Sequence, residues 1–169
     1  MKRNIELKAK CADLLAAREA SMKIGAQPQG VLVQTDTYFH VATGRLKLRE
    51  IENGRAELIW YARANETAFR ASDYIVSPVL DVPSMLTALT KALGVRGVVK
   101  KTRDLLLYHN VRIHLDEVQY LGTFIEFEAV ISDFDDEAVS RDRLIILTKA
   151  LAISDDDRIA VSYSDLMGI

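Results

Sequence analysis

The sequence has a single cysteine, Cys11, among its 169 residues. One cysteine cannot form an internal disulfide, and it has no cysteine partner with which to hold a metal ion. The opening segment, MKRNIELKAK, lacks the apolar run of a signal peptide, and no later run is long enough to span a bilayer. We therefore expect a cytoplasmic protein with no membrane partner.

The low net charge and the lack of paired histidines and nucleophile motifs disfavour several classes of function. The net charge is only −2, and no aromatic platform interleaves the cations, so we expect no nucleic-acid partner. The three histidines, His40, His109 and His114, form no metal-spaced pair, which favours surface or supporting positions over ligation. No serine or cysteine nucleophile motif is present. Function must therefore come from a local cluster of other side chains.

Strict alternation of polar and apolar residues predicts most of the chain to be β-strand. Asn53-Gly54 is a strong two-residue hairpin signal, and the polar stretch 65–72 is predicted to be an exposed loop. We expect one domain over residues 1–169, with a short strand and a turn at 163–167 near the end of the sequence. The principal predicted strands cover residues 4–10, 31–41, 45–49, 57–63, 74–76, 98–108 and the two halves of 111–128.

Three helices are predicted between these strands. Asp13 is a plausible N-cap for a helix through Ile24, and Asp81 for a second helix that ends at Gly94. The acidic segment 133–137 begins a third helix. Mostly antiparallel strands with intervening helices indicate an α+β fold, and the apolar helix faces leave a homodimer open.

The charges on the predicted strands are sorted strand by strand. Lysines and arginines share strand faces at 47 and 49 and at 101 and 103, whereas carboxylates gather at 116, 126 and 128. If helices cover the apolar faces, the charged faces must meet one another. A sheet closed into a barrel would place them around a polar lumen that admits a ligand.

A polyphosphate complexed with a divalent metal would satisfy both kinds of charge. Lysine and arginine donate to phosphate oxygens, while aspartate and glutamate supply the hard oxygen ligands that Mg²⁺ or Mn²⁺ prefers. A nucleoside or inorganic triphosphate is thus the ligand class that this composition favours. A solvated strand face is the alternative for any one of these carboxylate pairs taken alone.

Several blocks, in order along nearly the whole chain, resemble the CYTH superfamily, which is named for class IV adenylate cyclase and thiamine triphosphatase. The blocks are residues 4–8 (NIELK), 34–39 (QTDTYF), 46–49 (LKLR), 101–103 (KTR), 114–118 (HLDEV) and 124–128 (FIEFE). The resemblance implies a closed eight-stranded antiparallel β-barrel, the triphosphate tunnel, with helices packed outside, and metal-dependent chemistry on a triphosphate.

The resemblance also implies roles for individual residues. Metal ligation falls to Glu6, Asp116, Glu126 and Glu128, with Asp116 either a ligand or an orienting carboxylate. Phosphate binding falls to Lys8, Lys47, Arg49, Arg63, Lys101, Arg103 and Arg112. Catalytic roles are implied for Glu6, Asp116, Glu126, Lys101 and Arg103. This chain has Asn4 where the family has a first Glu, and Tyr61 where it often has Lys, although Arg63 lies on the same face.

Chemistry branches within the family. In a cyclase the ribose 3′ hydroxyl attacks the α-phosphorus of ATP, and in a hydrolase water attacks the terminal phosphorus; both depend on positioning and charge stabilisation. The block at 34–39 and the compact size favour the class IV adenylate cyclase branch, which forms cyclic AMP and pyrophosphate. The alternatives are hydrolysis of tripolyphosphate, thiamine triphosphate or a nucleoside triphosphate, and a noncatalytic triphosphate sensor, for which the loss of a ligand at Asn4 is the main argument.

Overall fold

The computed structural model describes residues 1–52 and 54–169, in which eight strands and four helices follow one another along the chain. The strands are β1 (Lys2–Lys10), β2 (Gln27–Phe39), β3 (Arg45–Ile51), β4 (Ala56–Arg63), β5 (Arg70–Val79), β6 (Val95–Tyr108), β7 (Val111–Val118) and β8 (Gly122–Val130). The helices are α1 (Leu14–Lys23), α2 (Val82–Leu93), α3 (Glu137–Ala150) and α4 (Tyr163–Leu166).

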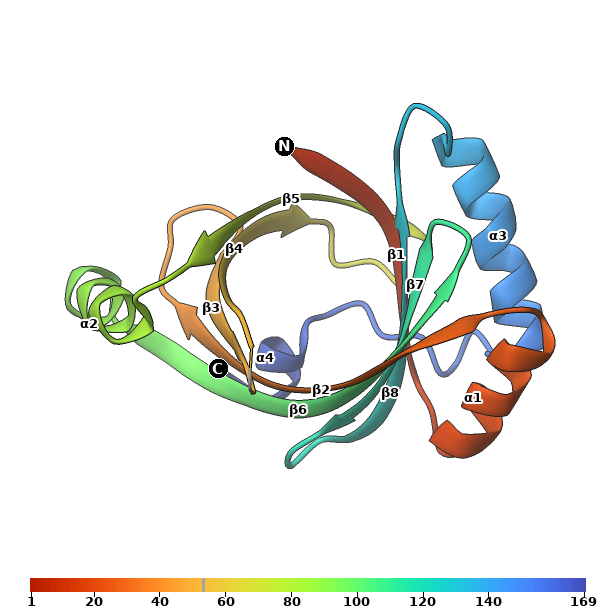
Figure 1. Cartoon of the computed structure of the whole chain (residues 1–169), viewed down its shortest axis with the longest axis horizontal. Helices are drawn as coiled ribbons and strands as arrows, with labels where there is room; N and C mark the ends of the chain where they lie inside the picture. The colour runs from red at the N-terminus through yellow and green to blue at the C-terminus, as the bar shows by residue number, and fades with distance from the viewer. Residues whose placement is uncertain (53) are drawn as a thin grey trace.

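All eight strands join in one closed antiparallel barrel, in the order β1-β5-β4-β3-β2-β6-β7-β8, and β8 pairs back to β1 (Figure 1). Closure leaves no edge strand, and every strand turns alternate side chains toward the lumen and toward the outside. The predicted eight-stranded barrel is therefore confirmed. Within the described residues, none of the helices has both the length and the apolar composition needed to cross a membrane.

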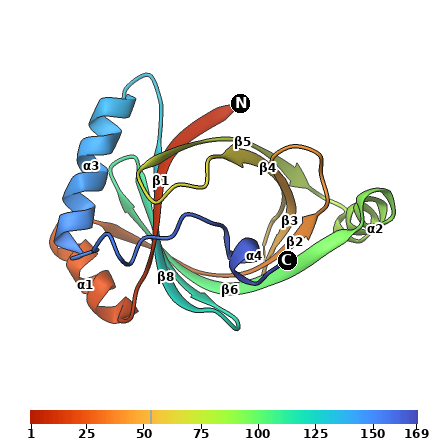
Figure 2. The ribbon, with the colours of Figure 1, turned by 180° about the vertical axis from the view of Figure 1, so that it is seen from behind.

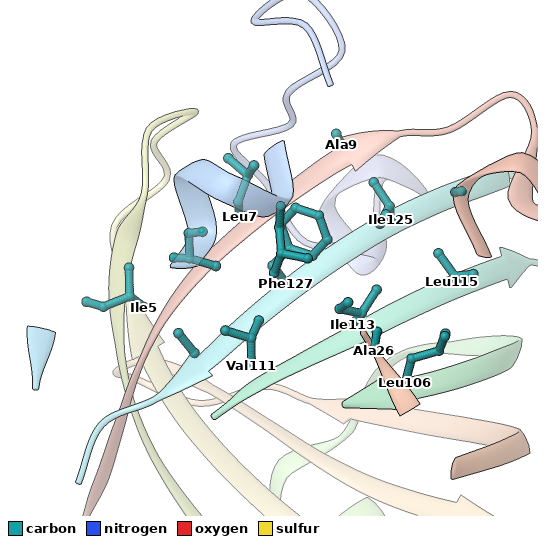
Figure 3. Close-up of a cluster of buried hydrophobic side chains, with 14 residues drawn as sticks. Ile5, Leu7, Ala9, Ala26, Leu106, Val111, Ile113, Leu115, Ile125 and Phe127 are labelled. Carbon is teal, nitrogen blue, oxygen red and sulfur yellow. The ribbon is translucent and has the colours of Figure 1, made fainter. Parts of the chain in front are cut away.

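The largest core lies outside the barrel wall, where β1, β7 and β8 meet α1 and α3 (Figure 1). Figure 3 shows Ile5 and Leu7 of β1 beside Ile113 of β7 and Phe127 of β8, all at most 2% exposed. Leu144 and Leu147 of α3 pack onto this layer. Burying it is the main apolar contribution to folding on this side, since burial stabilises by about 25 cal/mol per Å².

A second helix-covered face lies across the barrel, where α2 packs over Phe39, Leu48 and Val79. Asp81 caps α2 by accepting a hydrogen bond from the backbone N–H of Ser84. The predicted starts of α1 and α3 are likewise confirmed, because the side chains of Asp13 and Asp136 accept from the backbone at Ala16 and Val139. The helices thus fix the barrel from two opposite sides (Figures 1 and 2).

The short helix α4 packs differently from the other three. In both views it is seen within the outline of the ring formed by the strands (Figures 1 and 2). Its first residue, Tyr163, is 3% exposed and belongs to a small core with Tyr38, Val99 and Phe124. The sequence predicted a turn here, whereas the side chain of Ser162 starts a helix through a capping box with Asp165.

The predicted loop at residues 65–72 is wrong over its last three residues. Arg70, Ala71 and Ser72 begin β5 and pair with Glu6, Ile5 and Asn4 of β1. The polar composition of this segment misled the prediction, because a strand that faces a polar lumen need not carry the apolar side chains of an ordinary core strand. Arg70 is in fact only 2% exposed.

The start of β2 differs from the prediction, and the predicted turn between β3 and β4 lies partly outside the described residues. β2 begins at Gln27, upstream of the predicted start, because a register shift between Pro28 and Gly30 absorbs the proline. The predicted Asn53-Gly54 turn includes residue 53, which lies outside the described residues; the strands on either side of it, β3 and β4, do pair antiparallel.

Candidate functional site: a charged cavity in the barrel

The barrel encloses a cavity of about 140 Å³ into which charged side chains from six strands point. Its lining has more basic than acidic side chains, so it is suited to a multiply charged anion. The basic residues are Lys8, Lys47, Arg49, Arg63, Lys101, Arg103 and Arg112, and the acidic ones are Glu6, Glu57, Glu126 and Glu128. All seven cations predicted to bind phosphate therefore line one cavity.

One side of the cavity is built around Asp36, which is fully buried on β2. Its Oδ2 accepts hydrogen bonds from Nζ of Lys47 and of Lys101, both at 2.9 Å. Arg49 donates Nε to Oδ1 at 2.7 Å and Nη2 to Oδ2 at 2.8 Å. Burial alone would raise the pKa of Asp36, but these cations hold it well below its usual range.

Three cations on a single carboxylate leave this side of the cavity with unneutralised positive charge. The effect is evident at Lys101. Burial lowers the pKa of its amine to about 7 in spite of the contact with Asp36. The nearby Arg49 and Arg103 lower it further. An arriving anion would relieve this repulsion, so the cluster is arranged to favour binding of negative charge.

The other side of the cavity carries two carboxylates from β8, Glu126 and Glu128. Oε1 of Glu126 lies 3.2 Å from Nζ of Lys8, and its Oε2 accepts from Arg103 at 3.1 Å. Oε2 of Glu128 lies 2.9 Å from Nη2 of Arg112. Glu126 is buried and Glu128 partly buried. Each of these carboxylates thus meets the lumen while paired to a cation that could turn to another anion.

Asp116 is arranged differently, because both of its oxygens are engaged behind the lining. Arg103 donates Nε to Oδ1 at 2.7 Å and Nη2 to Oδ2 at 2.6 Å. The hydroxyl of Tyr163 donates to Oδ2 at 2.8 Å. Burial would raise the pKa of Asp116, but Arg103 lowers it to about 2. This geometry favours the orienting role for Asp116, holding Arg103 in the lumen.

Glu6 is also held by cations. Its Oε1 accepts from Nε of Arg70 at 2.9 Å and forms a short contact with Arg63. Arg70 in turn donates Nη1 to the carbonyls of Ile159 at 3.0 Å and Ala160 at 2.9 Å. The side chain of Arg70 therefore ties β1 to the segment that leads into α4.

Tyr163 brings α4 into the site. Its ring lies under the ammonium of Lys8, which is 3.7 Å from the ring centroid. The helix itself is tied to the barrel through Asp165, which accepts from Arg45 at 2.8 Å and from Arg96 at 3.0 Å. The end of the cavity at α4 is thus closed by an aromatic side chain that contacts Lys8 of the lining and the carboxylate of Asp116 behind it.

The predicted sorting of charge onto separate strands is only partly correct. Opposite charges stand directly across from each other on paired strands: Lys8 and Glu126, Arg112 and Glu128, Arg103 and Asp116, and Arg49 and Asp36. The physical reason is that a buried charge requires a partner, and a cross-strand position supplies one at fixed distance. The sequence shows charge along each strand but not which residues the register brings together.

Three comparisons with known proteins bear on this geometry. Residues 2–163 match the family model described as the CYTH domain. A protein of Methanocaldococcus jannaschii named "Putative adenylate cyclase MJ0240" is 26% identical over 174 residues, covering 98% of each chain. The match to the family model spans nearly the whole chain.

The chain belongs to the CYTH family.

Solved structures agree with this assignment at the level of the fold. The PH1012 protein of Pyrococcus horikoshii superimposes with a TM-score of 0.83 at 23% identity, covering 96% of this chain and 98% of the other. A Hippeastrum protein named "Putative adenylyl cyclase HpAC1", described as having a dominant triphosphatase activity, superimposes with a TM-score of 0.64 at 16% identity, over 99% and 94% of the two chains.

Within this CYTH barrel, the structure brings ten of the eleven predicted site residues to the cavity lining, and Asp116 lies directly behind it. Tyr61, which replaces a common family lysine, also lines the cavity, 5.9 Å from the guanidinium carbon of Arg63 by its ring centroid. The roles of these residues remain predictions, because position alone does not establish them.

Sequence reasoning missed three residues that contact the lining of the CYTH cavity. Asp36 could have been found, because it alternates with Gln34 and Tyr38 on a predicted strand. Arg70 gave no such signal, since it lay in a predicted loop. His114 was expected at the surface or behind a ligand, and the surface alternative is wrong: it is 3% exposed, 3.3 Å from Oε2 of Glu126 by its Nδ1.

The residues of this CYTH cavity fit a divalent metal. One ligand atom each from His114, Glu126 and Glu128 lies within 4.8 Å of the others. Asn4, the residue that replaces the first family glutamate, is 4% exposed and lines the same cavity, and its Oδ1 has no hydrogen-bond partner within the part of the chain that is described. An unpartnered buried oxygen beside carboxylates is the kind of donor that a hard cation uses.

Proposed function

We propose that this protein is a metal-dependent enzyme that acts on a triphosphate in the barrel, as a class IV adenylate cyclase that converts ATP to cyclic AMP and pyrophosphate. The observation that carries the proposal is the enclosed cavity, with its excess of cations around Asp36 on one side and carboxylates that meet on the other. The name of the Methanocaldococcus jannaschii relative supports the cyclase reaction.

The cavity suits a triphosphate better than a monovalent anion. Lys47, Arg49 and Lys101 share one carboxylate, so each can turn a donor to a phosphate oxygen while Asp36 continues to hold the group in place. Arg103 is kept in position by the bidentate contact with Asp116. Such preorganised donors stabilise charge on a reacting phosphorus without having to rearrange during the reaction.

The predicted metal ligands are Glu6, Asp116, Glu126 and Glu128, and Mg²⁺ or Mn²⁺ is the expected cofactor. When bound, the metal would withdraw charge from the phosphoryl group and orient it for attack. The chain's own residues then have three tasks: to bind phosphate oxygens, to exclude water at the end closed by Tyr163, and to hold Arg103 beside the reacting group. We infer a cytoplasmic location from the free Cys11 and from the use of a triphosphate.

Hydrolysis is the second candidate, because the same residues can serve water as the nucleophile. The Hippeastrum structure supports hydrolysis as a candidate function, since that protein shares the fold and is described as having a dominant triphosphatase activity. A noncatalytic sensor is the third, supported by the neutral Asn4 in place of a negative ligand.

One assay panel distinguishes these functions. The protein is incubated with Mg²⁺ or Mn²⁺ and with ATP, tripolyphosphate or thiamine triphosphate, and cyclic AMP, pyrophosphate and phosphate are separated. A cyclase forms cyclic AMP from ATP, a hydrolase releases phosphate, and a sensor binds without turnover. Glu126→Gln should reduce turnover by more than about a hundredfold, whereas Glu117→Gln, on the exposed face of the neighbouring strand β7, should leave it unchanged. Absence of product and of binding with all three compounds would refute the proposal.

A further inference from the structure

One part of the cavity lining carries no charge. It is centred on β5, whose three lining residues are all uncharged, and it continues onto the neighbouring strands β1 and β4. Phosphate groups and metal ions are charged, and proteins bind them with charged or strongly polar side chains. They therefore give no reason for this surface. We call it the uncharged wall, and it consists of Asn4, which stands opposite Ser72, of Tyr61, which stands opposite Tyr74, and of Ile59, which stands opposite Val76.

The uncharged wall lies away from the end of the cavity that Tyr163 closes. Tyr163 contacts Lys8 of β1, and Asn4 lies four residues before Lys8 on the same strand, about 13 Å away at 3.3 Å per residue. Asn4 is 4% exposed, whereas Val76 is 41% exposed. The wall therefore leads from the buried interior toward solvent, and a group attached to a phosphate in the cavity can extend along it.

Asn4 is the member of the wall whose hydrogen bonding is incomplete. Its Oδ1 is buried and has no hydrogen-bond partner among the described residues, which is destabilising for a polar atom. This oxygen is an acceptor, and the oxygens of an ionised phosphate are acceptors as well, so a phosphate cannot satisfy it. The missing partner is a donor, such as the O–H of an uncharged group.

The neighbours of Asn4 favour a hydroxyl over a metal ion as this partner. On β8 the residue opposite Asn4 is the apolar Val130, while the carboxylate of Glu128 stands opposite Glu6. On β5 the residue opposite Asn4 is Ser72, which is 3% exposed and also lines the cavity. An amide and a hydroxyl side by side offer both acceptors and donors, and a ligand hydroxyl can use both because it donates one hydrogen bond and accepts others.

We propose that the uncharged wall binds the sugar of a nucleoside triphosphate, and that Asn4 accepts a hydrogen bond from a ribose hydroxyl with Ser72 beside it. Tyr74 and Val76 would contact the apolar parts of the same nucleoside. The proposal rests on the proposed function in placing the triphosphate among the cations of the cavity. It adds a determinant of specificity, because recognition then depends on a hydroxyl that inorganic tripolyphosphate lacks.

The wall also accounts for the two positions at which this chain departs from the charged residues of the CYTH pattern. Asn4 stands in place of a glutamate and Tyr61 in place of a common lysine. They lie on the two strands that flank β5, opposite Ser72 and Tyr74. Both replacements remove a charge from the surroundings of β5. Recognition of an uncharged group favours this, since such a group gives a buried charge no counterion.

The test compares ligands that differ by one hydroxyl. Calorimetry measures the affinity of the full-length wild type for ATP, 2′-deoxy-ATP, 3′-deoxy-ATP and tripolyphosphate, with EDTA and again with Ca²⁺. In each condition in which ATP binds, we expect it to bind about tenfold or more tightly than the analogue that lacks the contacted hydroxyl. Equal affinities for ATP and both analogues, or no binding of ATP in either condition, would overturn the proposal.

Two variants identify the residues that carry the preference. Asn4→Ala should weaken ATP about tenfold and abolish the preference, with tripolyphosphate unchanged. Ser72→Ala should reduce the preference, and the control Ser77→Ala, at an exposed position of β5, should leave it intact. An equal loss of affinity for ATP and tripolyphosphate in Asn4→Ala would assign Asn4 to the phosphates or the metal and overturn the proposal.

The wild-type comparison decides the proposal even if a variant does not fold, because it needs no substitution. Failure of the proposal is also distinguishable from failure of the proposed function. Turnover of ATP without discrimination among the three nucleotides would retain the enzyme and remove the sugar site. Discrimination without turnover of any triphosphate would retain the sugar site and remove the enzyme.

Discussion

Removing the charge of Asp36 tests the basic side of the cavity. Asp36 is fully buried and holds Lys47, Arg49 and Lys101 through four charge-assisted hydrogen bonds of 2.7 to 2.9 Å. Asp36→Asn would leave two buried lysines and the partly buried Arg49 without a counterion. Breaking a buried ion pair from one side costs about 3–5 kcal/mol, and the deprotonation available to Lys101 would keep the loss within that range. For a chain of this size the melting temperature should fall by about 6–20 °C.

The same substitution gives a second prediction. Without Asp36, the cations of the cluster should gain more stability from a bound anion than they do in the wild type. Urea unfolding of wild type and Asp36→Asn is measured with and without tripolyphosphate, and the anion should recover more free energy of unfolding in the variant. Asp104→Asn is the matched control, since its pair with Arg18 is partly exposed and such pairs contribute about 0–1 kcal/mol. A loss no larger than in the control, or no greater rescue by tripolyphosphate, would refute the account of this cluster.

Three further predictions follow from the lining. With its pKa at about 7, the amine of Lys101 is mostly neutral at pH 8, whereas a bound polyphosphate favours the charged form. Polyphosphate binding at pH 8 should therefore take up a proton, which calorimetry in buffers of different ionisation enthalpy detects. Lys101→Met should abolish this uptake. Tyr163→Phe removes one donor to the buried Asp116 and should cost about 1–3 kcal/mol of unfolding free energy, so a loss within measurement error would mean that α4 does not pack as described. Asn4→Glu should raise Mg²⁺ affinity by adding a negative ligand, and an unchanged affinity would mean that Asn4 does not reach the metal.

Much of the barrel was predictable from the sequence because the strands alternate strictly. Glu6 and Lys8 share one face and Ile5 and Leu7 the other, and a chain with charged faces on most strands can bury them only around a polar interior. The caps at Asp13 and Asp81 were predictable for a similar local reason, since a short acceptor side chain satisfies the first free N–H groups of a helix.

What could not be predicted depends on register and on distant contacts. The sequence shows Arg103 and Asp116 as separate charges, whereas pairing of β6 with β7 places them directly opposite each other. Arg70 was missed because its two roles, on Glu6 and on the carbonyls of Ile159 and Ala160, join segments far apart in the chain. The position of His114 beside Glu126 was missed because it arises from cross-strand pairing and not from spacing in the sequence.

The central claim is that a triphosphate and a divalent metal fill this cavity together. A crystal structure of the protein with Mn²⁺ and tripolyphosphate, with anomalous data collected at the manganese edge, tests it most directly. We predict an anomalous peak beside Glu126 and Glu128, with phosphate oxygens within hydrogen-bond distance of Lys47, Arg49 or Lys101. A lumen without the polyphosphate in crystals grown at saturating ligand, or metal and phosphate bound only on the outer surface, would contradict the account.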